Sequence, residues 1–252
     1  MARRHKVNID GGGEQNPFAM STGDMMSGLM FVFVLLIIAL IWQIATQNKK
    51  SSDAVSEYQD TRDEIYKALK IAFDDSLYVW GAELDSSSLT IRFNEIALDG
   101  TPVLFGSGDT LLPPRYKSVM NHFFPSYLEI LSDDKFRNDI EEIRIEGHTD
   151  STKCYKQCET IERNYLYNMN LSQARSRNVL RYGLSETAVA NRPDLLEFAR
   201  ENIIATGLSF SQPRQTQDKS RRVEIRVRTK AQDKIDAIIK SLKGESSNGV
   251  TP

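Results

Sequence analysis

The chain has 252 residues, of which 32 are basic and 34 acidic, so its formal net charge at pH 7 is −2. It contains no basic block and its acidic residues are dispersed, which argues against a direct nucleic-acid partner and against an acidic interaction tail. One strongly apolar segment is joined to an otherwise polar chain, and the roughly 150 residues outside it and its flanks suffice for one well-buried domain.

Residues 1–17 contain three consecutive glycines and mixed charges, so we predict a flexible cytoplasmic tail. The apolar run within residues 18–47 predicts a transmembrane helix, because about 20 residues at about 1.5 Å each cross a bilayer core of about 30 Å. The run is longer than the apolar part of a signal peptide, and Trp42, a typical interfacial residue, lies near its C-terminal end. We therefore expect an uncleaved anchor. Basic residues flank both ends of the span and favour a cytoplasmic N-terminus only slightly.

Asp24 lies at the start of this span, immediately before the apolar run. An ionised carboxyl group is costly there unless it faces protein or water, so one hypothesis is that Asp24 carries a proton or another ion. The alternative is an aspartate that caps the helix start or rests among lipid headgroups. Ser27, Gly28 and Phe31 share the helical face of Asp24, and small residues permit close contact between membrane helices. This stripe favours the ion-carrying hypothesis, because a passive tether does not need it.

Residues 48–80 are rich in charge and predict a helical linker with one narrow apolar seam. The seam residues recur at spacings of three and four: Val55, Tyr58, Arg62, Ile65, Leu69 and Ala72. Two interpretations are open, a short parallel dimer contact and packing of the seam on the chain's own domain. Arg62 at a seam position weakens the dimer interpretation.

Residues 81–230 are predicted to form one domain in which helices and strands alternate. Alternation or short apolar runs predict strands at Leu89–Phe93, Ile143–Glu146, Ile203–Gly207 and Val223–Arg228. Apolar periodicity and capping residues predict helices at Pro114–Leu131, Ser172–Gly183 and Asp194–Asn202. A last helix and a disordered end are predicted within residues 231–252. We therefore expect an α+β fold, an α/β sandwich with helices on one face of a mixed sheet.

Three motifs occur in this domain in order: Ile145–Asp150, Asn168–Arg175 and Arg221–Ile225. On these motifs the region resembles the OmpA-like peptidoglycan-binding domain. With Asp24 at the start of the span, the whole chain is similar to the MotB-type stator subunits of ion-driven membrane motors, and the segment from Leu104 to Pro113 resembles a turn of that family. The compact linker and a binding loop expanded around two cysteines most resemble the MotB-like subunits of the Zorya anti-phage defence system.

The resemblance implies a pocket for wall stem peptides, whose diaminopimelate presents an ammonium and a carboxylate on one carbon. Asp150 would take the ammonium. Arg175, in the first turn of a helix, would fork onto the carboxylate with help from the backbone N–H groups of that helix start. Asn168 would hold the pocket loop, and the further wall-binding positions are Thr149, Leu171, Arg221 and Arg222. His148 is expected to orient the loop, and no metal ligand, cofactor or catalytic residue is expected.

Cys154 and Cys158 are four residues apart in the expanded loop. If this part of the chain lies outside the cytoplasm, a disulfide across a small loop is expected, and free thiols are the alternative. A zinc site would need further ligands, and no second Cys/His pair has suitable spacing.

The resemblance as a whole implies a non-enzymatic subunit of a proton- or sodium-driven motor. It would be a single-pass protein of the bacterial inner membrane with a periplasmic C-terminal domain. Its implied partners are a ring of polytopic MotA-like (ZorA-like) membrane subunits, a second copy of this chain, and peptidoglycan. Anti-phage defence is the leading function, while a flagellar-type stator for motility and a passive wall tether are the alternatives. A third class, an enzyme that acts on the wall, is not supported, because the sequence shows no nucleophile–base arrangement.

Overall fold

The computed structural model describes residues 17–97, 99–152, 158–232, 235 and 239–240. The predicted tail therefore lies almost wholly outside the described residues, as does most of the segment 231–252. The chain divides into two compact units, Met1–Ser52 and Asp53–Pro252. The first helix, α1 (Pro17–Trp80), begins in the first unit and ends in the second.

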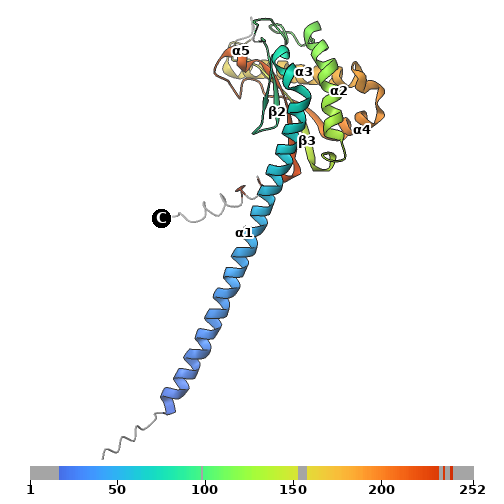
Figure 1. Cartoon of the computed structure of the whole chain (residues 1–252). Coiled ribbons are helices and arrows are strands. Elements are labelled where there is room, and N and C mark those ends of the chain that lie inside the picture. The colour runs from blue at the N-terminus through green and yellow to red at the C-terminus, as the bar shows by residue number, and fades with distance from the viewer. Residues whose placement is uncertain (1–16, 98, 153–157, 233–234, 236–238, 241–252) are drawn as a thin grey trace, which may run out of the picture. The chain divides into compact units, whose positions relative to one another are not determined.

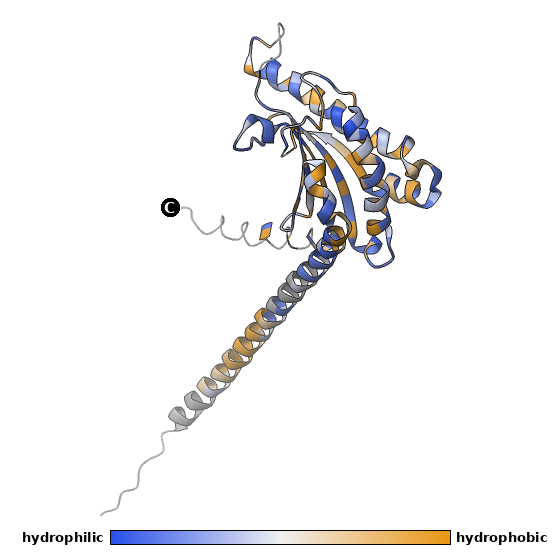
Figure 2. Ribbon diagram, turned by 45° about the horizontal axis from the view of Figure 1, so that its top comes forward, coloured by the Kyte–Doolittle hydropathy of each residue, from blue (hydrophilic) through white to orange (hydrophobic). Residues whose placement is uncertain are grey.

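The first unit contains the apolar part of α1. Its segment Met25–Gln47 has 23 residues, a mean hydropathy of 2.7 and no buried residue, and Figure 2 shows it as a mainly hydrophobic stretch of the helix. Among the described residues it is the one helical segment long and apolar enough to cross a membrane. The apolar helix predicted within residues 18–47 is confirmed.

The last turns of α1 belong to the hydrophobic core of the second unit. Four residues spaced by four are buried there: Ile65, Leu69, Phe73 and Leu77. The Phe73 ring lies 5.2 Å from the ring of Phe123 on a neighbouring helix. Of the two interpretations of the linker seam, the structure therefore supports packing on the chain's own domain. Ala72, the last predicted seam residue, is exposed.

The second unit is built on a five-stranded sheet with the strand order β1-β2-β5-β3-β4. Its strands are β1 (Ala82–Asp85), β2 (Thr90–Asn94), β3 (Ile140–His148), β4 (Ile203–Gly207) and β5 (Arg222–Thr229). β3 and β4 pair in parallel, whereas β1–β2, β2–β5 and β3–β5 pair antiparallel. The sheet is mixed, as predicted, and β5 runs through its centre.

Three helices cover one face of this sheet: α2 (Pro114–Ser132), α3 (Ile161–Ser185) and α4 (Pro193–Asn202) (Figure 1). Shorter turns complete the unit: η1 (Arg137–Asp139), η2 (Ala188–Asn191) and α5 (Gln217–Ser220). The strand residues that point toward the helices are apolar and buried, namely Ile91, Phe93, Ile143, Ile145, Val223, Ile225 and Val227. The predicted α+β class with helices on one face of the sheet is confirmed.

The start of α3 differs from the prediction. The helix begins at Ile161, after Thr160, whose hydroxyl accepts the Arg163 N–H, and not at Ser172. Ser172 lies in the middle of α3, where its hydroxyl accepts the backbone N–H of Ser209 at 3.0 Å. A residue type that often caps helices here makes a tertiary contact, so the local preference predicted the wrong boundary.

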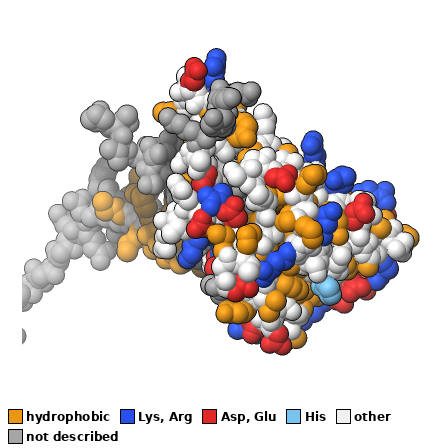
Figure 3. Space-filling view, turned by 90° about the horizontal axis from the view of Figure 1, so that it is seen from above, with side chains coloured by type: hydrophobic (Ala, Val, Ile, Leu, Met, Phe, Trp, Pro, Cys, Tyr) orange, Lys and Arg blue, Asp and Glu red, His pale blue; other side chains and the backbone are white. Residues whose placement is uncertain are grey.

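The other face of the sheet carries charged side chains at alternate positions of β3 and β5. Three of them are almost completely buried: Glu146 and His148 on β3 and Glu224 on β5, with exposed fractions of 3%, 1% and 1%. Buried carboxylates require partners, and Arg226 lies 3.3 Å from Glu224 and 3.7 Å from Glu146, while His148 lies 3.6 Å from Glu146. On the exterior shown in Figure 3, basic and acidic side chains are interspersed among the described residues.

Helix α3 approaches the ends of β3 and β4 closely at two glycines. A Cβ on Gly147 would lie 2.2 Å from the Ser172 carbonyl oxygen, and a Cβ on Gly207 would lie 2.3 Å from the Gln173 nitrogen. The Gln173 side chain fastens the same contact, because its amide donates to the Ala205 carbonyl at 3.0 Å and accepts the Gly207 N–H at 2.7 Å. Residues without a side chain permit this approach, which sets the distance between the strand ends and the middle of α3.

We predict that Gly147→Ala destabilises the domain, because the added methyl group meets helix backbone rather than a flexible side chain. Overpacking of this kind costs about 1–3 kcal/mol of unfolding free energy. Chemical denaturation of the full chain in non-ionic detergent measures the change. Gly106→Ala is the matched control, since its Cβ would meet only the Asp109 Cβ at 3.8 Å. Equal stability of the two variants would contradict the close approach.

Candidate wall-binding pocket

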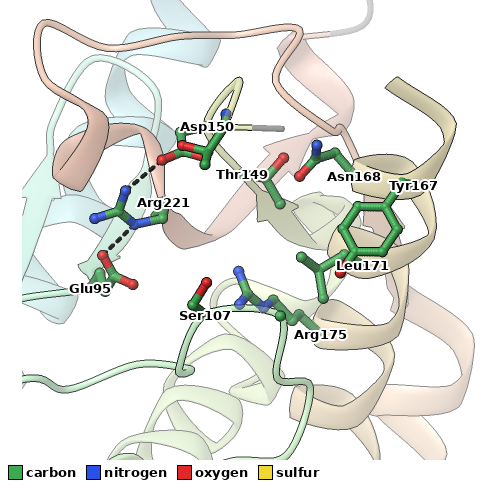
Figure 4. A pocket seen from close by; sticks show the side chains of 11 residues that line it. Glu95, Ser107, Thr149, Asp150, Tyr167, Asn168, Leu171, Arg175 and Arg221 are labelled. Carbon is green, nitrogen blue, oxygen red and sulfur yellow. Dashed lines mark hydrogen bonds and ion pairs between the residues drawn. The ribbon is translucent and has the colours of Figure 1, made fainter. Parts of the chain in front are cut away.

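A pocket of about 520 Å³ opens where the carboxyl end of β3 faces α3 (Figure 4). Its lining comes from several separate segments of the chain: Glu95, Ser107, Gly108, Thr149, Asp150, Thr152, Tyr167, Asn168, Leu171, Arg175 and Arg221. Six of the seven positions predicted to bind the wall are among them: Thr149, Asp150, Asn168, Leu171, Arg175 and Arg221. The structure therefore brings together these six residues, of which the first and last, Thr149 and Arg221, are 72 positions apart in the sequence.

Asp150 follows the carboxyl end of β3 and is 7% exposed. Its Oδ2 accepts a hydrogen bond from Arg221 Nη1 at 2.5 Å, and its Oδ1 accepts the Thr152 N–H at 3.1 Å. Burial alone would raise the pKa of Asp150, but the hydrogen bonds from Arg221 and Thr152 outweigh burial and lower it. Asp150 is therefore a carboxylate already held by a cation at the pocket's edge.

Arg221, just before β5, joins three carboxylates. Its guanidinium contacts Asp150 at 2.5 Å, Asp218 at 2.5 Å, and Glu95. Burial lowers the pKa of Arg221, but pairing with Glu95 and Asp150 has the larger combined effect and raises it. Two of these carboxylates, Glu95 and Asp150, line the pocket, and one guanidinium cannot neutralise both, so this side of the pocket keeps an excess of negative charge.

Arg175 lies on the opposite side of the pocket and is 5% exposed. Its Nε donates to the Asp109 carbonyl and its Nη2 to the Gly106 carbonyl, both at 2.8 Å, and its guanidinium lies 5.0 Å from the Phe105 ring. Burial lowers the pKa of Arg175. Within the described residues Arg175 forms no ion pair, and backbone carbonyls orient its guanidinium, although Glu95, Asp109 and Asp150 attract its charge from beyond hydrogen-bond distance.

One part of the prediction for Arg175 is wrong. Because α3 begins at Ile161, Arg175 is not in the first turn of a helix. The backbone N–H groups around it are engaged within the helix and cannot be offered to an anion. The guanidinium group itself is the donor that this part of α3 presents to the pocket.

Two buried asparagines connect α3 to the loop after β3. The amide of Asn168 donates to the Asn164 carbonyl at 3.0 Å and to its side-chain oxygen at 3.1 Å. The amide of Asn164 donates in turn to the Ser151 carbonyl at 3.2 Å. Asn168 therefore holds the pocket loop indirectly, by positioning Asn164, which bonds the loop. Beside them, the Thr149 hydroxyl is buried and has no hydrogen-bond partner among the described residues.

The structure does not bring Arg222 to this pocket. Its side chain lies on the face of the sheet away from the helices and donates from Nε to Glu224 at 2.6 Å. Conversely, Glu95 and Tyr167 line the pocket and were not predicted. Glu95 directly follows the alternating strand β2, which was a usable signal, and Tyr167 directly precedes the motif that begins at Asn168.

His148 belongs to a buried cluster with Glu146 and Glu224 whose ligand-type atoms lie within 4.8 Å of one another. Such a composition suits a metal ion, but Arg226 Nη2 lies 3.3 Å from Glu224 Oε2 and 3.7 Å from Glu146 Oε2. A guanidinium thus occupies the cation position between the carboxylates. Burial lowers the pKa of His148. We assign the cluster to an ion-pair network rather than to a metal site.

The predicted span and cysteine residues lie partly outside the described side chains. Asp24 belongs to α1, but its side chain is not described. Ser27, Gly28 and Phe31 are exposed, and a Cβ on Gly28 would meet nothing within 4 Å. Cys154 falls in the undescribed segment 153–157, while Cys158 is buried with an exposed fraction of 5%. The disulfide stays a prediction.

We predict that Arg221→Met lowers the unfolding free energy at pH 7 by about 1–3 kcal/mol, since it leaves partly buried carboxylates unpaired. The pKa of Asp150 is lowered in the folded chain. Its contribution is therefore complete above about pH 4, the ordinary aspartate pKa, and is lost as the pH falls through the lowered value. The difference between parent and variant should shrink on acidification, as measured by chemical denaturation at pH 7 and at about pH 3.

Arg181→Met is the matched control for this comparison, because Arg181 lies exposed on α3 and forms no ion pair among the described residues. It should leave the unfolding free energy nearly unchanged at both pH values. A difference between parent and Arg221→Met that does not depend on pH would contradict the assigned pairing of Asp150.

Comparison with curated proteins gives two relatives that are both Zorya proteins. No family model matches the chain. A Zorya protein ZorB from Escherichia coli strain ATCC 8739 is 34% identical over 232 residues, which covers 90% of this chain and 94% of the relative. A second Zorya protein ZorB, from Escherichia coli O139:H28, is 21% identical over 216 residues, covering 84% of this chain and 80% of the relative.

Two crystal structures of the periplasmic domain of Helicobacter pylori MotB are similar to the chain. Both are 14% identical to it, with TM-scores of 0.36 and 0.35, and each covers 68% of this chain. The matched regions span 92% and 89% of the two MotB chains. The identity and coverage of the first relative decide the family: the chain belongs to the ZorB family of Zorya proteins.

Proposed function

We propose that this chain is the ion-carrying, wall-anchored subunit of a stator-like inner-membrane motor that acts in anti-phage defence. Membership of the ZorB family supports a stator-like anti-phage subunit that partners a MotA-like (ZorA-like) membrane subunit. The observation that carries the wall-binding part is the pocket, in which Asp150 and Glu95 line one side and Arg175 the other. No catalytic step is proposed.

The charge distribution of the pocket suits a zwitterion such as the diaminopimelate centre of a wall stem peptide. Its ammonium group would meet the acidic side, where one guanidinium is shared by three carboxylates and negative charge is in excess. Its carboxylate would meet Arg175, which forms no ion pair within the described residues. Charge-assisted hydrogen bonds at both ends fix the orientation of such a ligand.

The size of the pocket agrees with this ligand class. About 520 Å³ lies within the range of about 300–1,000 Å³ that is usual for small-molecule sites. Tyr167 and Leu171 add apolar surface beside Arg175, which suits the methylene chain of diaminopimelate. Because Arg221 already holds Asp150, the incoming ammonium would share the carboxylate with Arg221 or draw on the second carboxylate, Glu95.

In the membrane, Asp24 would bind and release a proton or sodium ion at the start of the span. Desolvation disfavours the charged form of a buried carboxyl group, and access to water restores it, so alternating access can couple ion passage to a conformational cycle. The exposed stripe of Ser27, Gly28 and Phe31 would receive helices of the polytopic partner. We propose two copies of this chain in the complex, a cytoplasmic N-terminus and a periplasmic second unit.

We predict that Asp150→Asn and Arg175→Lys each weaken binding to purified peptidoglycan about tenfold or more, since each removes charge-assisted hydrogen bonds worth about 1.5–3 kcal/mol. Sedimentation of the full chain in detergent with wall sacculi measures this. Asp134→Asn, at an exposed aspartate that does not line the pocket, is the control. Thermal melting identifies any variant that fails to fold. Parent-like sedimentation of both folded variants would disprove the pocket assignment.

We predict that Asp24→Asn abolishes phage protection while the chain still assembles with its membrane partner, because an amide cannot carry a proton. Asp24→Glu should retain part of the protection. Plaque counts in the native host give the activity, and co-purification of the partner gives assembly. Full protection by the asparagine variant would favour the passive wall tether over the motor.

A further inference from the structure

A second pocket opens on the face of the sheet away from α2, α3 and α4. It has a volume of about 210 Å³ and shares no lining residue with the pocket of Figure 4. Its lining residues come from β1, β2, the start of β5, and the segment before and within α5: Glu83, Arg92, Asn94, Arg214, Gln215, Lys219 and Arg222. Four of these seven side chains are cationic and one is acidic.

The register of the sheet brings these side chains to one face. Arg92 pairs with Glu83 on one side and with Glu224 on the other, and Asn94 pairs with Arg222. Directly paired residues, and residues two apart on a strand, point to the same side of a sheet. The strand pairing therefore fixes the positions of two of the cations, Arg92 and Arg222, while Arg214 and Lys219 approach from the segment before β5.

These cations share too few carboxylates. Three guanidinium nitrogens converge on one oxygen, Glu224 Oε1: Arg222 Nε at 2.6 Å, Arg92 Nε at 3.2 Å and Arg214 Nη2 at 3.6 Å. A single carboxylate oxygen cannot satisfy three guanidinium groups. Burial and the neighbouring charges of Arg214 and Arg92 lower the pKa of Arg222, although pairing with Glu224 opposes them.

Lys219 adds a further positive charge at the edge of the pocket. It is exposed and forms no ion pair within the described residues. Asp85 contacts Arg92 at 2.6 Å, and Glu83 lines the pocket. Even when both are counted with Glu224, the cations of the site outnumber its carboxylates. An anion would relieve this imbalance.

We propose that this pocket binds a ligand carrying a phosphate group. The cations approach from different elements, and a tetrahedral phosphate offers oxygen atoms in several directions, whereas a carboxylate offers two in one plane. Arginine forks and a lysine point charge are common partners of phosphate oxygens. The volume of about 210 Å³ is below the usual range for drug-sized ligands, so it suits a phosphate ion or a phosphorylated headgroup.

Isothermal titration of the full chain in non-ionic detergent with sodium phosphate tests the proposal, with sodium acetate at equal ionic strength as the comparison anion. Phosphate should bind with a dissociation constant on the order of 1 mM or tighter, and acetate should bind at least tenfold more weakly. Lys219→Met should weaken phosphate binding about tenfold. The exposed Lys230 provides a control, and Lys230→Met should bind as the parent does.

Folding does not confound this test, because the Lys219 side chain is exposed, and melting without phosphate checks each variant. Phosphate binding no stronger than acetate binding, or unchanged in Lys219→Met, would overturn the proposal. Short-chain phosphatidylglycerol distinguishes the two sources. Lys219-dependent binding of this lipid that is at least tenfold tighter than that of phosphate identifies a headgroup site, and phosphate binding without lipid binding identifies a site for the free ion.

Discussion

The close contact between α3 and the ends of β3 and β4 is the constraint on which the candidate wall-binding pocket depends. It is made possible by Gly147 and Gly207, whose missing side chains leave room for the backbone of Ser172 and Gln173. Asp150 lies three residues beyond Gly147, and Arg175 lies two residues beyond Gln173. A single helix–sheet contact therefore sets both sides of the site, and the charged residues add their chemistry to a distance fixed by packing.

Charge is handled differently on the two sides of the sheet. On the pocket side, negative charge exceeds positive charge around Arg221, while the hydrogen bonds of Arg175 go to carbonyl groups and not to a carboxylate. On the face away from the helices, arginines exceed carboxylates around Glu224, whose pKa falls to about 2 because the arginines outweigh the effect of burial. Unbalanced charge in a partly buried setting is costly, and it is relieved by a ligand of opposite sign.

Much of the fold and site could be predicted from the sequence where a local pattern reports directly on structure. Alternation in β2, β3 and β5 specified which side chains face the core, and the three motifs specified most of the pocket lining. The start of α3 was predicted wrongly, because the hydroxyl of Ser172 does not cap a helix but accepts a hydrogen bond from Ser209, which is 37 residues distant. Glu95 was missed because alternation gives the face of a strand but not which loop its end will meet. The four residues of β1 are too few to show a period.

The central claim is that the pocket holds the wall zwitterion between Asp150 and Arg175. A crystal structure of the second unit, residues 53–252, with meso-diaminopimelate tests it most directly. The account predicts an ammonium nitrogen within about 3 Å of the Asp150 carboxylate and the carboxylate of the same ligand centre on the Arg175 guanidinium. An empty pocket at saturating ligand, or a ligand that contacts neither residue, would contradict it.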